Sequence, residues 1–243
     1  MTDSRERFGS RAENYAAYRP SHAPEAVDAA LEGLGDPAGL VVADVGAGTG
    51  LSSHLFAARG ATVFAIEPNA SMRAKAETHA RITWRDGTAE TTGLPAKSVD
   101  VVVAAQAFHW FATPQAMAEF VRIARQRAAL LQYERDERDP FTEAYGETVR
   151  AYATDDTEDL RKRGMLVFES FPRARLASSA TSMQRLDLAA LLGRAASSSY
   201  LPASGEMGER LAADLRALFD RFQRDGYVTM HLITYALTAD LEP

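Results

Sequence analysis

The sequence predicts an α/β protein built on a doubly wound, mostly parallel β-sheet. Apolar runs typical of strands alternate with helical patterns from residue 24 to residue 132. One run, at 40–45, is followed by three alternating glycines, and another, at 99–105, is almost entirely valine and alanine. Strands covered by helices on both faces have such continuous apolar runs, and strands that alternate with helices join through right-handed crossovers. These features together indicate a parallel sheet between two helical layers.

Length and composition predict one domain in a cytoplasmic protein. The 243 residues, 46% of them hydrophobic, can bury one sizeable core with a small appended subdomain. The chain contains no cysteine, which excludes disulfides and thiolate-bound metals. Its formal net charge of -6 disfavours nucleic acid as a partner, because it supplies no overall attraction to phosphates. Residues 1–11 lack the apolar core of a signal peptide and no apolar run reaches membrane-spanning length, so no membrane partner is expected.

Strand-like runs and helical patterns follow one another through the first half of the chain. Pro24 begins a helix whose apolar stripe runs to Leu34, with Gly35 placed to end it. Asn69 is placed to cap a helix that starts at residue 70, because its side chain can accept the first free backbone N–H groups. The other expected elements are strand 40–45, helix 52–59, strand 61–67, a weak strand at 82–85, strand 99–105, helix 113–124 and strand 128–132.

The pattern is less regular beyond residue 133. The charged run at 134–139 is typical of an exposed connection. Asp187 can cap a helix that follows it, and leucine and phenylalanine form one stripe near residue 215. The expected elements are helices at 141–152, 188–195 and 211–222, and a final strand at 227–238 that is rich in β-branched and aromatic residues.

Polar side chains come at the ends of the predicted parallel strands. Asp44, Glu67, Asp86 and Gln106 each stand at or just after the last residue of a strand. In doubly wound sheets, ligands bind beyond the carboxyl ends of the strands, near the point where the strand order reverses. The convergence of these four residues therefore predicts a ligand site at that edge.

The glycines after the first strand allow two classes of nucleotide cofactor. A dinucleotide fingerprint has the spacing G-x-G-x-x-G, whereas Gly46, Gly48 and Gly50 have the spacing G-x-G-x-G. Because the third glycine is not at the dinucleotide-binding spacing, a nicotinamide-dependent dehydrogenase is the weaker alternative. Glu67 strengthens the prediction of a nucleoside site, because a carboxylate at the end of the next strand can accept both hydroxyls of a ribose.

Several motifs together resemble one enzyme family. They lie at 42–50, 64–69, 87–90, 94–95, 98–100 and 106–111, with an aromatic N-terminal segment at 8–20. The set resembles class I S-adenosylmethionine-dependent methyltransferases, most closely the small-molecule branch that includes the trans-aconitate and ubiquinone/menaquinone enzymes. The resemblance implies a Rossmann-like, mostly parallel seven-stranded sheet, with an antiparallel C-terminal strand pair at 171–186 and 227–238 and a small helical cap.

The resemblance also implies the division of the chain and the residues that hold S-adenosyl-L-methionine or its product S-adenosyl-L-homocysteine. Residues 1–243 would be one methyltransferase domain, with lid helices in 1–35, a cofactor-binding core in 36–133, cap elements in 134–226 and a final strand in 227–243. The implied cofactor-binding residues are Tyr15, Tyr18, Arg19, Asp44, Gly46, Ala47, Gly48, Gly50, Glu67, Pro68, Met72, Thr88, Ala89, Glu90 and Gln106.

Four side chains are candidates for acceptor binding or catalysis. Gln106 would face the methyl group, and His109 is the best-placed residue to accept a proton near neutral pH. His22 and Trp110 are candidates for acceptor contact. For His22, His109 and Trp110, packing within the fold is an equal alternative to contact with the acceptor. Neither histidine nor acid spacing predicts a metal site.

The predicted function is S-adenosyl-L-methionine-dependent methyl transfer to a small-molecule acceptor, at oxygen or at a carboxylate. The chain would act as a monomer or homodimer without nucleic acid or membrane. A nucleic-acid methyltransferase is opposed by the acidic charge balance and by the lack of a base-flipping motif after the fourth strand. The remaining alternative is a protein of the same fold that binds the cofactor and transfers nothing.

Overall fold

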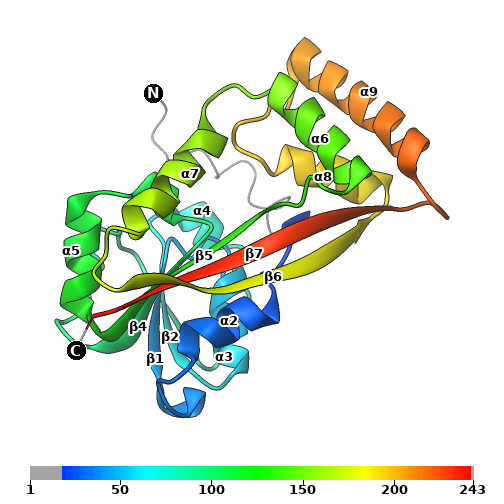
Figure 1. Ribbon diagram of the computed structural model, residues 1–243. Coiled ribbons are helices and arrows are strands. Elements are labelled where there is room, and N and C mark those ends of the chain that lie inside the picture. Colours follow the sequence, from blue (N-terminus) through cyan, green and yellow to red (C-terminus); the bar gives the residue numbers. More distant parts are fainter. Residues whose placement is uncertain (1–17, 242–243) are drawn as a thin grey trace.

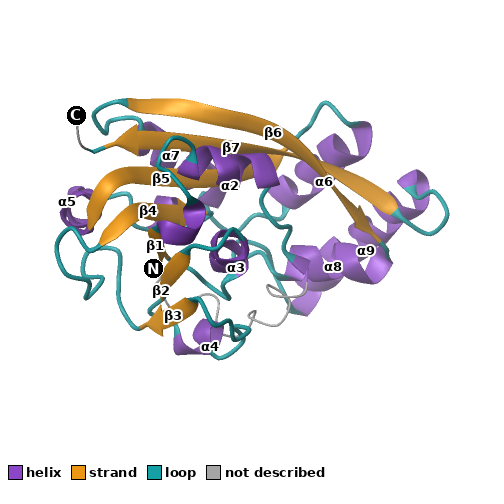
Figure 2. Ribbon diagram, turned by 90° about the horizontal axis from the view of Figure 1, so that it is seen from below, coloured by secondary structure: helices purple, strands orange, loops and turns teal. Residues whose placement is uncertain are grey.

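One mixed sheet of seven strands runs through the part of the chain that the computed structural model describes, residues 18–241. The sheet order is β3-β2-β1-β4-β5-β7-β6, which can be followed from one edge to the other in Figure 2. The strands β1 to β5 are parallel, whereas β7 is antiparallel to both β5 and β6. The strands are β1 (Val41–Val45), β2 (Thr62–Ile66), β3 (Ile82–Arg85), β4 (Val99–Ala105), β5 (Ala124–Arg135), β6 (Ala174–Leu186) and β7 (Val228–Asp240). The predicted Rossmann-like fold and its antiparallel C-terminal pair are confirmed.

Helices cover both faces of this sheet because its central strands are apolar on both sides. Every residue of β4 is buried. On one face, α2 (Pro24–Leu31) and α3 (Leu51–Ala58) pack on the sheet through an apolar cluster that includes Phe56 and Leu131. On the other face lie α5 (Pro114–Ile123) and the end of α7 (Thr157–Phe168). The strands reverse their order between β1 and β4, which places the switch point of the sheet at the middle of the molecule.

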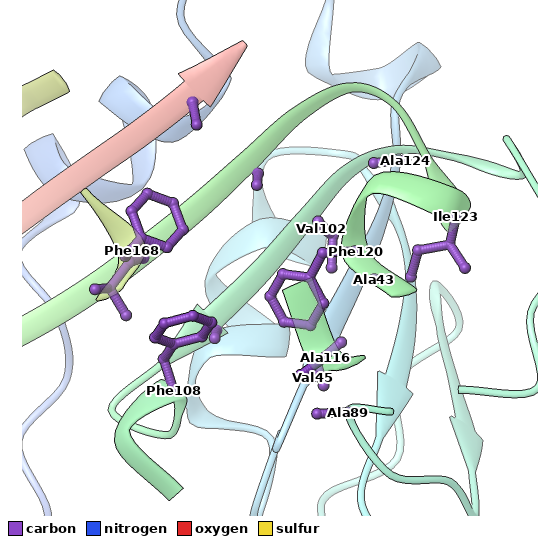
Figure 3. Packing of buried hydrophobic residues seen from close by; sticks show 14 of the residues in the cluster. Ala43, Val45, Ala89, Val102, Phe108, Ala116, Phe120, Ile123, Ala124 and Phe168 are labelled. Carbon is purple, nitrogen blue, oxygen red and sulfur yellow. The ribbon is translucent and has the colours of Figure 1, made fainter. Parts of the chain in front are cut away.

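Aromatic rings form the centre of the second core. Figure 3 shows Phe108, Phe120 and Phe168 in one cluster, with Phe120 beside Val102 of β4. The ring of Phe108 meets that of Phe168 edge-on, with centroids 5.6 Å apart, and lies 6.0 Å from that of Phe120. Edge-on aromatic pairs add to the stabilisation from apolar burial. This packing fixes the short helix η3 (Phe108–Trp110) at the end of β4, beside the site described below.

A helical cap stands beyond the carboxyl ends of the parallel strands. The long strands β5, β6 and β7 lead to it. Helix α6 (Pro140–Ala151) follows β5, whereas α8 (Leu188–Ala196) and α9 (Gly205–Phe222) come between β6 and β7, as Figure 1 shows. A third apolar cluster, which includes Leu191 and Leu215, packs these helices on the ends of β5 and β7. Among residues 18–241, no helix has the length and apolar character needed to cross a bilayer.

Most element predictions hold, and the exceptions have physical causes. The strands at 82–85 and 99–105 match, and Asn69 and Asp187 accept backbone N–H groups as helix caps. The helix from residue 70, α4 (Ala70–Arg73), has only one turn, and α2 ends at Leu31 before the predicted residue 34. Helix α7 was not predicted, because its apolar stripe is interrupted by a charged first half. The short 3-10 helix η2 (Pro37–Gly39) leads into β1.

The prediction of an exposed connection at 134–139 is partly wrong. Glu134 and Arg135 are the last residues of β5, where they pair with Ile233 and Leu232 of β7. The side chain of Arg135 is only 13% exposed. Antiparallel pairing with a strand distant in sequence extended β5 into the charged run, and local composition carries no signal of that pairing.

Candidate active site

A cavity of about 150 Å³ lies at the carboxyl ends of β1, β2 and β4. Four segments enclose it: the glycine loop after β1, the loop after β2, the loop after β3, and the segment from the end of β4 into η3. The predicted site residues that line it are Gly46, Gly48, Glu67, Pro68, Met72, Thr88, Ala89, Glu90, Gln106 and Trp110. Residues not predicted as binding residues also line it, namely Asn69, Gly87, Ala105, Ala107 and Phe111. Each of these neighbours a predicted residue in sequence or in the loop.

The glycine loop brings bare main chain into this cavity. Its first turn is anchored because Gly46 and Ala47 both donate their N–H groups to the carbonyl of Ile66, at 2.9 and 3.1 Å. Gly46 has φ +73°, and a Cβ atom added there would lie 2.7 Å from Cβ of Ala107. Only glycine satisfies both constraints without strain. The loop therefore offers a ligand backbone atoms that no side chain covers.

Glu67 follows β2 and is held by two loops. Glu67 is buried, with only 8% of its surface exposed. Oε2 accepts the N–H of Gly48 at 2.9 Å, and Oε1 accepts the N–H of Asn69 at 2.8 Å. Burial raises the pKa of this carboxyl, while the two backbone N–H groups act in the opposite direction. Each carboxylate oxygen can accept a second hydrogen bond, so an anchored Glu67 can still receive two hydroxyl groups.

Asp44 lies behind the glycine loop and does not line the cavity. It is fully buried, and Oδ2 accepts the hydroxyls of Ser52 and Ser53, each at 2.6 Å. Oδ1 is buried without a hydrogen-bond partner in residues 18–241. Burial raises the pKa of this carboxyl, and the serine hydroxyls lower it. A buried acceptor without a donor is costly, so this oxygen is suited to a donor that arrives with a ligand.

Gln106 holds a strained backbone at the end of β4. Its φ of +54° is unusual for a residue other than glycine. Nε2 donates to the carbonyl of Tyr133 at 2.9 Å, which fixes the orientation of the amide. Oε1 is then left buried, and no donor reaches it from the described residues. Strain of this kind concentrates at functional sites, where the surrounding structure maintains it.

A second, smaller cavity of about 20 Å³ adjoins the first and is lined by Arg19, His22 and Ala47. The two cavities share Gly46, Ala105 and Gln106 as wall residues. Arg19 donates to the carbonyl of Ser197 at 3.2 Å and to Oγ of Ser198 at 3.3 Å, which ties this wall to the cap. Burial lowers the pKa of His22 to about 4, so the ring is neutral at neutral pH.

Three further predicted residues, Tyr18, Gly50 and His109, do not line the main cavity. The ring of Tyr18 packs on Gly193 of α8, and Gly50 faces Trp84. His109 lies behind Trp110, with ring centroids 4.7 Å apart, and its backbone packs on Gly164 of α7. Tyr15 and the first 17 residues of the predicted lid lie outside the described residues.

The methyltransferase domain family matches residues 43–131, the segment that forms the cavity. The match covers less than half of the chain and assigns a methyltransferase domain to this segment alone. The resemblance inferred from the motifs is thus confirmed, and S-adenosyl-L-methionine is the cofactor of this family.

Relatives of the methyltransferase domain occur in bacteria and fungi. An uncharacterized methyltransferase of Mycobacterium tuberculosis is 37% identical over 149 residues, which cover 58% of this chain and 58% of that protein. The match therefore spans little more than half the length of this relative. An uncharacterized methyltransferase of Schizosaccharomyces pombe is 24% identical over 248 residues, or 95% of each chain.

Solved structures agree with the fold of the methyltransferase domain. A protein of Anaeromyxobacter dehalogenans, assigned as a type II methyltransferase, superposes with a TM-score of 0.71 at 22% identity and covers 93% of this chain and 99% of its own. A protein of Anabaena variabilis, assigned as a methyltransferase of antibiotic biosynthesis, has a TM-score of 0.59 at 23% identity, with 86% and 96% covered. At such identity the likeness establishes the architecture of the fold and not the substrate.

Proposed function

We propose that the chain transfers a methyl group from S-adenosyl-L-methionine to a small-molecule acceptor. The observation that carries the proposal is the buried carboxylate of Glu67, fixed by Gly48 and Asn69 at the edge of the cavity with acceptor capacity to spare. A ribose diol is the ligand group that such a carboxylate suits, because it offers two adjacent hydroxyl donors.

The other walls suit the remaining parts of the cofactor. Oδ1 of Asp44 and Oε1 of Gln106 are buried acceptors without donors from the described protein, and a ligand ammonium group, directly or through water, can supply donors to both. Arg19 adjoins the glycine loop and can pair with a carboxylate. Pro68 and Met72 offer an apolar wall for adenine. The residues present therefore fit the group that the family uses.

The chain's own contribution to the reaction is orientation and exclusion of water. The bound cofactor supplies an electrophilic methyl group on a sulfonium. Gln106, Trp110 and Phe111 line the cavity, and in this proposal they would orient the acceptor atom toward that group. Alignment of two reacting groups is worth about 7 to 11 kcal/mol of barrier, so a site of this kind needs little further chemistry.

We propose an acceptor atom that needs no base, such as a carboxylate oxygen. His109, the expected base, is buried and does not line the cavity. Burial, together with the positive charges of Arg161 and Arg19, lowers the pKa of His109 well below its ordinary value. A group with so low a pKa accepts a proton poorly at neutral pH. Packing against Trp110 is the role that this position favours.

Two measurements test the proposed function. Calorimetry with S-adenosyl-L-homocysteine is expected to give heat that saturates at one site per chain. Incubation with methyl-labelled S-adenosyl-L-methionine and a metabolite extract is expected to give a labelled small molecule by mass analysis. Absence of heat with either cofactor form would remove the basis of the proposal. Heat without any labelled product would favour a binding protein of the same fold, and an absorbance change with a nicotinamide cofactor would favour a dehydrogenase.

A further inference from the structure

The cap holds a cluster of arginines beside the proposed active site. A small cavity of about 30 Å³ is lined by Arg19, Arg135, Arg161 and Arg194, which come from the end of the N-terminal segment, β5, α7 and α8. Glu134 is the acidic side chain among its wall residues. Four guanidinium groups around so small a space are unusual, because buried cations are costly unless an anion accompanies them.

The fold neutralises one of these charges and leaves two without a carboxylate. Arg135 forms ion pairs with Glu158 and, at 3.2 Å, with Glu137. Arg194 is only 6% exposed, and its hydrogen bond goes to the neutral side chain of Gln184, at 2.6 Å.

Arg161 is the second of the two arginines without a carboxylate. Its Nε atom is buried and has no hydrogen-bond partner within residues 18–241, and its guanidinium carbon lies 5.7 Å from the ring centroid of Tyr200. The described part of the chain therefore provides no carboxylate for either Arg161 or Arg194.

Neighbouring groups respond to this positive field. Burial would raise the pKa of the Tyr200 hydroxyl, yet Arg161, Arg135 and Arg19 bring it below its ordinary value. Burial lowers the pKa of Arg194, and the charge of Arg19 acts in the same direction. Both shifts have the direction expected of a pocket that lacks an anion.

The arginine cavity lies next to the reactive end of the proposed active site. It shares Arg19 and Tyr133 with the small cavity that adjoins the glycine loop, and that cavity shares Gln106 with the main one. The hydrogen bond from Gln106 to the carbonyl of Tyr133 joins the walls of these cavities. The three cavities are therefore neighbours that share wall residues.

On the basis of the proposed function, we propose that Arg161 and Arg194 bind a carboxylate of the acceptor, which is therefore an organic acid. A volume of about 30 Å³ admits two or three atoms of the size of a water oxygen, since one water requires about 10–15 Å³ by the same measure. That space suits a planar carboxylate better than a tetrahedral phosphate. Guanidinium groups grip carboxylates through paired hydrogen bonds, which fixes the orientation of the acid as well as its charge.

The test is calorimetric titration of the full chain, saturated with S-adenosyl-L-homocysteine, with three acids and their amides. The probes are acetate, succinate and benzoate against acetamide, succinamide and benzamide, with inorganic phosphate as a further probe, all at millimolar concentration. At least one acid is expected to bind about tenfold or more tightly than its amide, because the amide lacks the charge. Binding of inorganic phosphate in place of every acid would overturn the carboxylate assignment, as would equal binding of acids and amides or binding of none.

Variants assign the binding to the arginines. Arg161→Gln and Arg194→Gln are each expected to weaken the acid about tenfold or more and to leave S-adenosyl-L-homocysteine affinity unchanged, which also shows that the variants are folded. Arg163→Gln is the matched control, because Arg163 lies on the same helix, is 59% exposed and pairs with Asp156 at 2.5 Å. Equal loss in the control, or no loss in Arg161→Gln, would refute the proposal. If the wild-type chain binds no S-adenosyl-L-homocysteine, the proposed function fails, and the acid titration on the cofactor-free protein still decides whether the arginines bind carboxylates.

Discussion

Replacing Glu67 by glutamine is expected to weaken S-adenosyl-L-homocysteine binding while the chain stays folded. In the structure, both carboxylate oxygens accept backbone N–H groups, from Gly48 at 2.9 Å and from Asn69 at 2.8 Å. Glutamine has one acceptor oxygen, so its amide nitrogen must face one of those N–H groups. The substitution also removes the negative charge that strengthens hydrogen bonds from ribose hydroxyls.

The size of both effects can be estimated. A hydrogen bond to a charged group is worth about 1.5–3 kcal/mol, which corresponds to a loss of about 10- to 150-fold in affinity. One buried N–H without an acceptor costs about 1–3 kcal/mol of folding free energy. For a chain of this length, each kcal/mol lowers the melting temperature by about 2–4 °C. Calorimetry measures the first effect, and thermal unfolding without ligand measures the second.

Glu119→Gln separates the two effects. Glu119 is 8% exposed, as Glu67 is, and its carboxylate accepts the N–H of Thr92 at 3.0 Å and pairs with Arg122. It does not line the cavity. This variant is therefore expected to lose stability and keep its affinity for S-adenosyl-L-homocysteine. If Glu67→Gln binds as tightly as the wild type, or if both variants lose affinity equally, the assignment of Glu67 to the ribose is wrong.

Three further predictions follow from the same geometry. Gly46→Ala is expected to lower both the melting temperature and cofactor affinity, because its Cβ would meet that of Ala107 at 2.7 Å on a backbone of φ +73°; an unchanged unfolding curve would contradict this. His109→Asn is expected to lower the melting temperature and leave the pH profile of methyl transfer unchanged between about pH 6 and 8, whereas a profile that shifts would restore His109 as a base. His22→Gln is expected to reduce the acid sensitivity of folding. Because the pKa of buried His22 is about 4 and that of the unfolded chain 6.5, its neutral ring contributes stability that is full above pH 6.5 and is lost as the pH falls toward 4. The wild type should lose about 3 kcal/mol more than the variant over that range in urea unfolding, and parallel losses would refute the burial argument.

Local sequence patterns were enough to predict the elements around the proposed cofactor site. The strand at 99–105 was predictable because burial on both faces demands a continuous apolar run, and Asn69 because a helix start needs a side-chain acceptor. Gly46 and Glu67 were predictable for a similar reason, since a sharp turn and a strand-end carboxylate are properties of short segments.

Other features depended on residues far apart in the sequence. Strand β5 reaches Arg135 because β7 pairs with it, and β7 lies about a hundred positions later. His109 lies beside Trp110 because its backbone packs on Gly164 of α7. This helix could not be predicted from its own segment, because the first half is charged.

The sequence by itself determined the fold class, the resemblance to methyltransferases and the edge of the sheet where the proposed cofactor residues meet. Each of these depends on the order and spacing of residues within short segments. Only the tertiary structure brought Arg161, Arg194 and Arg19 together, since three separate elements carry them and nothing in their local sequence couples one to another. It also decided that Asp44 does not line the cavity, and that Oε1 of Gln106, a residue of the cavity wall, is buried without a donor from the described residues. The acceptor recognition that we propose therefore depends on charges that meet only when the cap packs on the sheet.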